Sequence, residues 1–297
     1  MINAKMIKEK ALELGATVCG IGKIYCEDDP QRDPLMILPK AKCIIGFGFA
    51  VPRGLYVAME NAQMYPYTNY GVKFIDEEFA EIFLLKMGAF IEDNGYDACL
   101  QKTVPNLRIK GDKSTNPEVK DTYELVYAEP VEEGKPAPDV IIDFAKAARA
   151  CGLGAKGLSG KVLSPKHGPF MRFCFIITDA PLETDAAFEG EICDNCGACM
   201  RACPGKAISE NGLDTWQCSV YYKGAHRSNP YINGEYLKDH PQREAIINGD
   251  YRFDSESARD IYPELDFLPK TQWGYSACLC GRKCDIACYE HLFSKIN

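Results

Sequence analysis

Apolar residues recur at two spacings along the first 190 residues, and these spacings predict helices that alternate with strands. Spacings of three and four residues predict helices over residues 5–14 and 74–94. A third helix is predicted over residues 139–150, because Pro138 and Asp139 are typical of a helix start and Gly152 of a helix end. Short apolar runs predict strands at residues 16–21, 41–49, 124–128 and 171–178. This alternation favours an α/β (α+β) layered core.

The pattern changes near residues 183–191. Beyond Glu191, glycine, cysteine and proline are frequent and periodicity is weak. Before that point, two polar, proline-bearing loops are predicted at residues 110–120 and 129–138. We therefore predict an α/β core domain over residues 1–187 and a cysteine-rich domain over residues 188–297, and a length of 297 residues is sufficient for both.

Charge and hydropathy disfavour several classes of protein. The chain has 34 Lys and Arg against 42 Asp and Glu, a net charge of −8, so we do not expect a nucleic-acid partner. The longest apolar stretch, residues 43–52, is about half a membrane span, and the N-terminus shows no export signal. We therefore expect a cytoplasmic protein with no membrane anchor. In a reducing cytosol, clustered cysteines hold metal more often than they form disulfides.

The 15 cysteines are distributed unevenly. Six are scattered singly before residue 193, and we interpret them as small core residues: Cys19, Cys26, Cys43, Cys99, Cys151 and Cys174. The other nine lie between residues 193 and 288. Four of these form Cys193-Asp-Asn-Cys196-Gly-Ala-Cys199-Met-Arg-Ala-Cys203-Pro204, which has the bacterial ferredoxin spacing for a [4Fe–4S] cluster. A zinc ribbon would instead use paired C-x2-C units.

In the ferredoxin pattern the fourth cysteine of such a motif ligates a second cluster. The chain supplies the further thiolates that a second cluster needs. The ferredoxin cross-over assigns the first cluster to Cys193, Cys196, Cys199 and Cys288. It assigns the second cluster to Cys203, Cys218, Cys280 and Cys284. Because three residues separate Cys280 from Cys284, a departure from the ferredoxin spacing, Cys278 is an alternative to Cys280.

The motifs around this segment resemble those of the epoxyqueuosine reductases and reductive dehalogenases. In chain order they are Gly152-Leu-Gly154-x-x-Gly157, Leu163-Ser-Pro-x-x-Gly168-Pro-x-x-Arg172-Phe, Thr178-Asp-Ala-Pro-Leu182, the cysteine motif, and Asp214-x-x-x-Cys218-x-x-Tyr221. The resemblance covers residues 138–288. It implies a nitroreductase-like layered core that binds a base-off corrinoid (cobalamin), followed by a bacterial ferredoxin-like domain whose two [4Fe–4S] clusters feed the corrinoid electrons.

The resemblance also implies roles for residues near the glycine-rich segment. It implies that the backbone at Gly157 and Ser159 approaches the corrinoid closely, and that Arg172 contacts a corrinoid amide or phosphate. The alternatives are an ordinary helix C-cap with a glycine turn, and a surface ion pair for Arg172. A dinucleotide site is disfavoured, because a helix rather than a strand precedes Gly152.

No catalytic residue is named. The position at which the family carries its proton donor falls near Pro138, so Asp139 and Asp143 are candidates, with a helix-start role as the alternative. Further candidates, or packing aromatics, are Tyr65, Tyr67 and Tyr70. The histidines, for which we expect surface or structural rather than ligand roles, are His167, His226, His240 and His291.

Two functions are weighed. The first is an iron–sulfur oxidoreductase that passes single electrons through two [4Fe–4S] clusters to a corrinoid that reduces a small molecule, with ferredoxin or flavodoxin as the redox donor. The second is a two-cluster electron-transfer protein that serves a partner enzyme or a corrinoid protein. The core of nearly 190 residues favours the first. Epoxyqueuosine reduction in tRNA ranks third, because the chain is acidic and ends nine residues after Cys288 without a helical-repeat extension.

Overall fold

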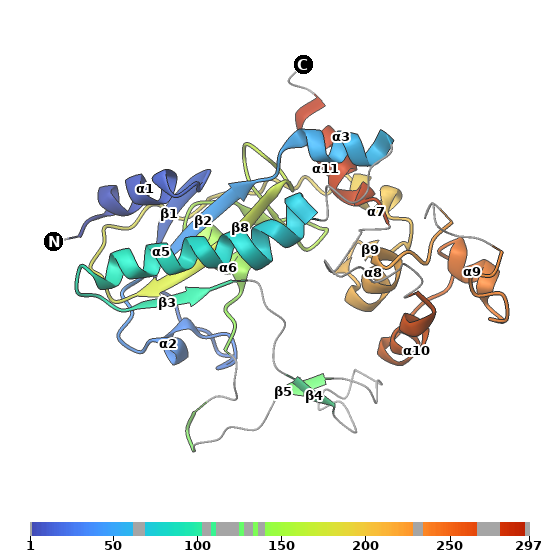
Figure 1. Ribbon diagram of the computed structural model, residues 1–297, viewed down its shortest axis with the longest axis horizontal. Helices are drawn as coiled ribbons and strands as arrows, with labels where there is room; N and C mark the ends of the chain where they lie inside the picture. The colour runs from blue at the N-terminus through green and yellow to red at the C-terminus, as the bar shows by residue number, and fades with distance from the viewer. Residues whose placement is uncertain are drawn as a thin grey trace.

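A computed structural model of the chain describes residues 2–61, 69–102, 108–110, 125–127, 133–135, 140–227, 234–265 and 280–294. Its centre is a four-stranded sheet with helices around it, and a group of shorter helices lies beyond one end of the sheet (Figure 1). In spatial order the strands are β1 (Val18–Lys23), β2 (Cys43–Ala50), β8 (Met171–Thr178) and β3 (Ala98–Gln101). All three pairings are antiparallel, and Ile45 of β2 lies opposite Ile21 on one side and Ile176 on the other.

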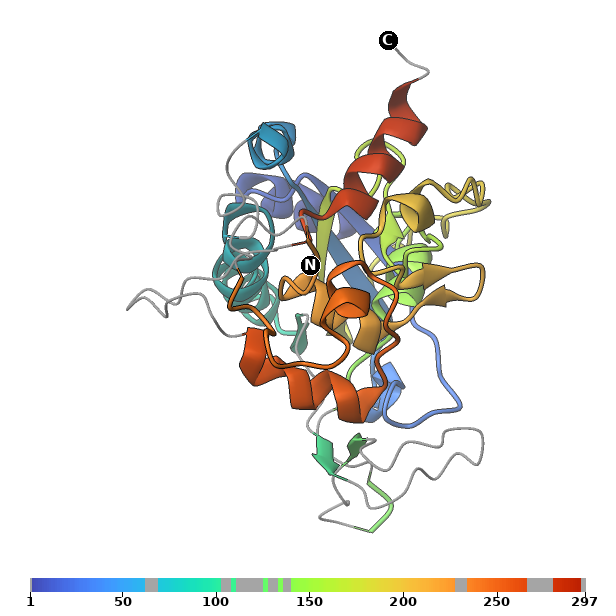
Figure 2. The same ribbon diagram turned by 90° about the vertical axis from the view of Figure 1, so that its right-hand side faces the viewer.

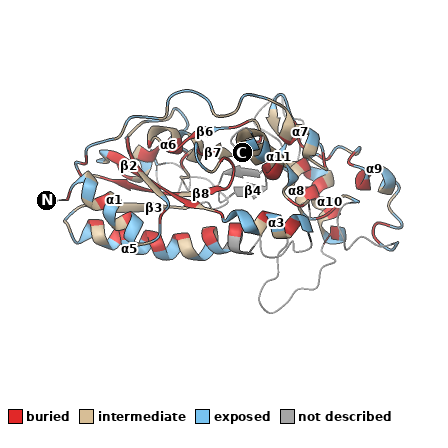
Figure 3. Cartoon of the chain, turned by 90° about the horizontal axis from the view of Figure 1, so that it is seen from above, coloured by how far each residue is buried: buried red, intermediate tan, exposed pale blue. Residues whose placement is uncertain are grey.

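Helices cover both faces of this sheet. One face packs against α1 (Ala4–Glu13), η1 (Asn69–Phe79) and α5 (Ala80–Glu92), and Phe47 and Phe83 meet there edge to face at 4.9 Å. The other face packs against α2 (Pro34–Ile37) and α6 (Phe144–Ala150). Because both faces are covered, seven of the eight residues of β2 are buried, and the central strands form the buried interior of the chain (Figure 3).

Two glycines of β1 let the end of α6 lie directly on the strand. A Cβ at Gly20 would lie 1.9 Å from the carbonyl oxygen of Cys151, and one at Gly22 would lie 2.7 Å from the carbonyl carbon of Ala150. A side chain at either position would therefore separate the helix from the sheet. The C-terminal end of α6, and the segment that follows it, are thus held at a fixed height above the sheet.

Most predicted elements are confirmed, with shifted ends. Helix 5–14 is α1, helix 74–94 is α5 preceded by the π-helix η1, and strands 41–49 and 171–178 are β2 and β8. Strand 16–21 begins later than predicted, because the N–H of Ala16 still donates to Ala11 of α1. Helix 139–150 begins only at Phe144. The remaining predicted strand is β5 (Leu125–Tyr127), which pairs with β4 (Arg108–Lys110) outside the main sheet.

The later part of the chain is built from short elements, which Figure 2 shows from their own end of the molecule. They are β9 (Ile208–Ser209), β10 (Gly212–Leu213), α7 (Ala198–Ala202), α8 (Thr215–Tyr222), α9 (Arg243–Ile247), α10 (Ser255–Leu265) and α11 (Lys283–Phe293). Helices α8, α9 and α10 share a hydrophobic core of their own around Val220, Ile246 and Ile261. Helix α11 instead joins the main core through Ile286 and packs Tyr289 against Phe170.

Smaller elements connect these parts. They are α3 (Arg53–Asn61), β6 (Ala155–Lys156) and β7 (Val162–Leu163). The strands β6 and β7 pair as a short antiparallel hairpin directly after α6, and the turn between them carries residues 157–161. Among the described residues, none of the helices combines the length and the apolar character that crossing a membrane requires.

Candidate metal centre and adjoining pocket

Four cysteines from two separate segments of the chain line one small cavity, and we call them the first thiol group: Cys193, Cys196, Cys199 and Cys288. Cys193 and Cys196 come from the loop that leads into α7, where Asn195 and Gly197 adopt left-handed backbone conformations (φ 57° and 72°), and Cys199 lies in α7 itself. Such turns let a short loop curl around a compact object. The fourth comes from α11, which packs against α7.

The thiols of this group act on one another electrostatically. Burial raises the pKa of Cys288 to about 12, and the neighbouring thiols of Cys199, Cys193 and Cys196 add to that rise. All four cysteines also line the same cavity, so their thiols surround a common centre. A bound cation at that centre reverses the effect, because a coordinated thiol is held as thiolate. Four converging thiols match the ligand set of one [4Fe–4S] cluster.

The remaining described cysteines of the segment form a second thiol group: Cys203, Cys218, Cys280 and Cys284. Burial raises the pKa of Cys218 to about 11, and the thiols of Cys280 and Cys203 contribute to the rise. Burial likewise raises the pKa of Cys284 to about 12, with Cys280 contributing again. The backbone N–H of Ala207 donates to the Sγ of Cys203 at 3.3 Å. These four thiols also match one [4Fe–4S] ligand set, whereas Cys278 lies outside the described residues.

A group of charged side chains lies against the second thiol group. The carboxylate of Asp285 is completely buried, and it accepts hydrogen bonds from Lys161 Nζ and, at 2.7 Å, from Arg282 Nε. Lys161 Nζ is also 3.7 Å from the Sγ of Cys284. Arg282 has a left-handed backbone conformation at the start of α11 (φ 47°), which turns the chain between Cys280 and Cys284.

One loop connects the two thiol groups. Residues 157–161 form a tight turn, in which the N–H of Gly157 donates to the carbonyl of Lys161 at 2.7 Å. The N–H of Leu158 donates to the Sγ of Cys193 in the first group at 3.5 Å. Lys161, at the other end of the turn, reaches Cys284 in the second group. A substitution that moves this turn would therefore disturb both groups.

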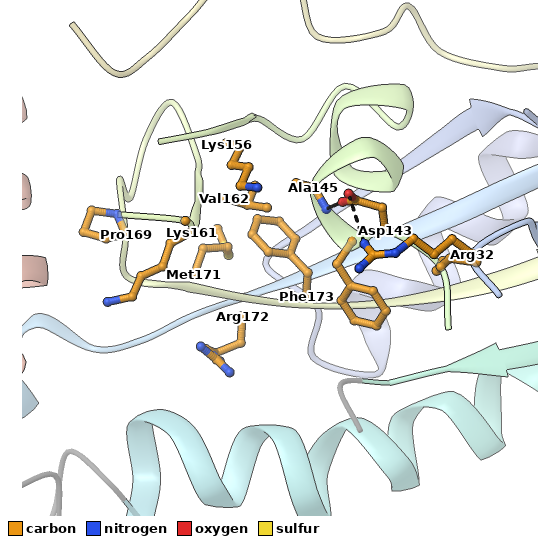
Figure 4. A pocket seen from close by; sticks show the side chains of 13 residues that line it. Arg32, Asp143, Ala145, Lys156, Lys161, Val162, Pro169, Met171, Arg172 and Phe173 are labelled. Atoms are coloured by element: carbon orange, nitrogen blue, oxygen red, sulfur yellow. Dashed lines mark hydrogen bonds and ion pairs between the residues drawn. The ribbon is translucent and has the colours of Figure 1, made fainter. Parts of the chain in front are cut away.

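The same loop forms one wall of a pocket with a cavity volume of about 380 Å³, which we call the cationic pocket. Four cations line it: Arg32, Lys156, Lys161 and Arg172. In Figure 4, Arg32 and Asp143 are joined at one end of the pocket, and Lys161 lies at the other. Between them the lining is apolar and includes Val162, Met171 and Phe173.

The structure places the other predicted residues as follows. Arg172 lines the cationic pocket and is also ion-paired with Asp76 of η1, so the ion pair weighed as its alternative role is present. Gly157 and Ser159 are buried in the turn, and Gly160 and Lys161 are the residues of that turn that line the pocket. Asp143 is the N-cap of α6, where it accepts hydrogen bonds from the N–H groups of Ala145 and Lys146.

His291 makes a contact that sequence spacing does not predict: its Nε2 lies 2.7 Å from Asp194 Oδ2 beside the first thiol group, and its side chain is 29% exposed. The two residues are 97 positions apart, so spacing gave no sign of the contact. Cys26 is exposed rather than a core residue. The candidate donors Asp139, Tyr65 and Tyr67 lie outside the described residues.

Sequence reasoning also missed Lys161 and Asp285. The only available signal was the position of Asp285 directly after a predicted ligand, Cys284. Lys161 is 123 residues away from that ligand in the chain, so only the fold brings the two together.

Comparison with known proteins agrees with an iron–sulfur segment around Cys193, Cys196, Cys199 and Cys203. Residues 188–209 match the family described as 4Fe-4S binding domain. An epoxyqueuosine reductase of Leadbetterella byssophila is 29% identical over 109 residues, which are 35% of this chain and 36% of that protein. A tetrachloroethene reductive dehalogenase of Sulfurospirillum multivorans is 37% identical over 62 residues, 20% of this chain and 12% of that protein. The chain thus carries an iron–sulfur domain and aligns with about a third or less of the length of these relatives.

Solved structures extend the likeness to the whole fold. A crystal structure of selenomethionine-labelled epoxyqueuosine reductase matches with a TM-score of 0.52 at 14% identity, over 92% of this chain and 68% of that one. The catabolic reductive dehalogenase NpRdhA in complex with 3-bromo-4-hydroxybenzoic acid matches with a TM-score of 0.52 at 15% identity, over 99% of this chain and 36% of that one. The resemblance to the epoxyqueuosine reductases and reductive dehalogenases is confirmed, in fold and in the cysteine segment.

Proposed function

We propose that the chain is an iron–sulfur oxidoreductase of a small molecule, in which the two thiol groups hold two [4Fe–4S] clusters and the cationic pocket holds a corrinoid. The observation that carries this proposal is the loop at residues 157–161. It contacts a cysteine of each thiol group and lines the pocket. Both clusters and a molecule in the pocket would therefore be separated by little more than this one turn, which suits transfer of single electrons into the pocket.

The pocket, with a volume of about 380 Å³, would take part of a corrinoid, and its lining suits the face and edge of the macrocycle. Val162, Met171 and Phe173 supply an apolar surface for the flat face of a macrocycle. Lys156 and Arg172, at the edge, supply hydrogen-bond donors for peripheral amides or a phosphate, and the ion pair with Asp76 fixes the orientation of Arg172. A bound corrinoid would supply the metal centre at which a substrate is reduced, and the chain would supply binding, orientation and exclusion of water.

The same proposal extends to the architecture. The sheet with helices on both faces supports a nitroreductase-like core over residues 1–187, and the cysteine segment supports a ferredoxin-like two-cluster domain over residues 188–297. The separate hydrophobic core of α8, α9 and α10 favours this division. Helix α11 crosses it, since Ile286 packs in the main core. That packing would hold Cys288 and the second-group ligands at a fixed distance from the pocket.

The first thiol group is the proposed entry point for electrons. Asp194 and Asn195 beside it are exposed, so a small redox protein such as a ferredoxin or flavodoxin has access to this side of the group. The substrate is proposed to be a small molecule. The structure of an epoxyqueuosine reductase with an epoxyqueuosine-modified tRNA stem loop favours a tRNA substrate, but the net charge of −8 weakens attraction to phosphates, so this candidate ranks below the first.

The experiment that tests the proposal begins with reconstitution of the full chain with iron and sulfide without oxygen. We expect about eight irons per chain, four for each thiol group. Titration with hydroxocobalamin should then give the absorbance of a base-off corrinoid at a stoichiometry of about one. Replacing Cys278 and Cys280 separately by serine should show that only Cys280→Ser costs half of the iron.

A variant of the pocket makes the test specific. Ala145 lines the pocket without contacting either thiol group, so Ala145→Trp should weaken corrinoid binding at least tenfold and leave the iron content unchanged. Lys146→Trp is the matched control, because Lys146 is the exposed neighbour of Ala145. Failure of the unmodified chain to bind hydroxocobalamin would contradict the corrinoid site and favour the electron-transfer protein. An iron content near four would contradict the second cluster.

A further inference from the structure

Two charged side chains against the second thiol group, Asp285 and Arg282, have no part in the function proposed so far, and Lys161 has none beyond its place in the loop at residues 157–161. We call Lys161, Asp285 and Arg282 the charged triad. Asp285 is completely buried and pairs with both cations, and its oxygen Oδ2 lies 2.6 Å from Arg282 Nη2. Lys161 and Arg282 are themselves mostly buried, with side chains 22% and 14% exposed. The triad therefore carries a net charge of one positive unit in a region from which most water is excluded.

A need for stability does not explain such a group. Desolvation of buried charges commonly offsets their mutual attraction, and well-packed apolar side chains of similar size often stabilise a protein as much or more. Charge in a poorly solvated place does have a long electrostatic reach, because little water screens it. The nearest group for this charge to act on is the second thiol group, since Lys161 Nζ is 3.7 Å from the Sγ of Cys284.

The two thiol groups differ in the charges beside them. The first has the carboxylate of Asp194 next to its cysteines, and His291 is the partner of that carboxylate. The second has the net positive triad. A [4Fe–4S] cluster with four thiolates is anionic, and accepting one electron makes it more negative by one unit. A neighbouring positive charge therefore stabilises the reduced form, and hydrogen bonds and charge near the sulfurs are known determinants of cluster potential.

We propose that Lys161 is a positioning residue for electron flow, which raises the reduction potential of the second cluster and so directs electrons from the first cluster towards the cationic pocket. The proposal rests on the proposed function, because it requires the second thiol group to hold a cluster. Lys161 is suited to this role by its place in the fold: it is the residue that contacts a second-group cysteine and also lines the pocket.

The proposal predicts changes of opposite sign for two members of the triad. Lys161→Met removes a positive charge, so the equilibrium for reduction of the second cluster should become about tenfold less favourable, which is about 59 mV for a one-electron couple. Asp285→Asn removes a negative charge and should make reduction more favourable by a similar factor. Lys161→Arg retains the charge, so the equilibrium constant for reduction of the second cluster should stay within about threefold of that of the unmodified chain. A purely structural role would not give opposite signs.

The measurement is a redox titration with dithionite and mediators, followed by electron paramagnetic resonance, on the full chain reconstituted with iron and sulfide. The signal of the first cluster is the internal reference for the two Lys161 variants. Asp285→Asn is compared with the unmodified chain instead, because Asp285 also acts electrostatically on Cys288 of the first thiol group. Lys156→Met is the matched control. Lys156 lines the same pocket, but among the described residues it contacts no cysteine, whereas Lys161 contacts Cys284. In Lys156→Met, the equilibrium constant for reduction of the second cluster should stay within twofold of that of the unmodified chain.

The outcomes separate this proposal from the proposed function. Opposite shifts of the second cluster in Lys161→Met and Asp285→Asn, with Lys161→Arg close to the unmodified chain, would support it. Unshifted potentials in variants that retain eight irons would overturn it and leave the two-cluster function standing. An unmodified chain that takes up only four irons would overturn both. If Asp285→Asn fails to fold, the contrast between Lys161→Met and Lys161→Arg still decides the matter, because it needs only the effect of one charge.

Discussion

Cysteines in two regions of this molecule show that residue type alone does not determine the role of a cysteine. In the sheet, the thiols of Cys43 and Cys174 are fully buried among apolar side chains, and that of Cys151 is 2% exposed. Two of them pair with the backbone: the S–H of Cys43 donates to the carbonyl of Ala180, and that of Cys151 to the carbonyl of Ile44. In the cysteine-rich segment, four of the described thiols line one small cavity, and Cys218 and Cys284 of the second group lie within electrostatic reach of the thiol of Cys280.

Burial raises thiol pKa values in both regions, so protonation does not distinguish them. It raises the pKa of Cys43 to about 11 in the sheet and that of Cys218 to about 11 in the second thiol group. The difference lies in convergence. A metal cluster stabilises thiolates only where several meet at one centre, and a lone thiol among isoleucines behaves as a small apolar side chain.

The largest expected effect is the loss of iron when one cysteine of a thiol group is replaced. Cys199→Ser removes a ligand from the first thiol group and should cost about four of eight irons per chain, because a [4Fe–4S] cluster does not assemble stably on three thiolates and a poor fourth ligand. Iron analysis and the visible absorbance of the reconstituted protein measure it.

The matched control is Cys174→Ala, which removes a buried thiol of the sheet. It should keep all of the iron and lower the free energy of unfolding by about 1 kcal/mol, the value of a small apolar group. Equal iron loss in the two variants would contradict the division of the cysteines into ligands and core residues.

A smaller effect is expected from the close contact between β1 and α6. Gly20→Ala places a Cβ against the carbonyl oxygen of Cys151 and should lower the free energy of unfolding by about 3 kcal/mol. Denaturation in urea measures this. Gly54→Ala is the control, since a Cβ at Gly54, in helix α3, meets no atom within 4 Å and should be neutral or slightly stabilising. An unfolding free energy unchanged by Gly20→Ala would contradict the direct packing of α6 on the strand.

The smallest effect concerns the start of α6. Asp143→Ala removes the side chain that accepts hydrogen bonds from Ala145 and Lys146 and should cost about 1 kcal/mol of unfolding free energy. Asp143→Asn should cost much less, because asparagine caps helices about as well. The midpoint of urea denaturation measures both. If the asparagine variant were as unstable as the alanine variant, the ion pair with Arg32 rather than the cap would hold this helix start.

The spacing of apolar residues was sufficient to predict those helices and strands in which the spacing is regular. Strand β8 has the bounds that its apolar run predicts, and α1 and α5 follow from apolar spacing. Strand β3 was not predicted, because its four half-buried residues show no distinctive alternation. The start of α6 was placed too early, since Pro138 and Asp139 resemble a helix start but Asp143 supplies the cap. Propensity marks several acceptable starts, and packing selects among them.

By itself the sequence determined the iron–sulfur chemistry, because the spacing of Cys193, Cys196 and Cys199 is a local property that one loop can satisfy. Only the tertiary structure decided what surrounds those thiols. It brought His291 to Asp194 and Lys161 to Cys284 across 123 residues of chain. Such contacts depend on where helix α11 and the loop after α6 are packed, and packing is set by the whole core rather than by neighbours in sequence. A sequence motif therefore identifies the ligands, and the fold brings up the charged side chains that act on them.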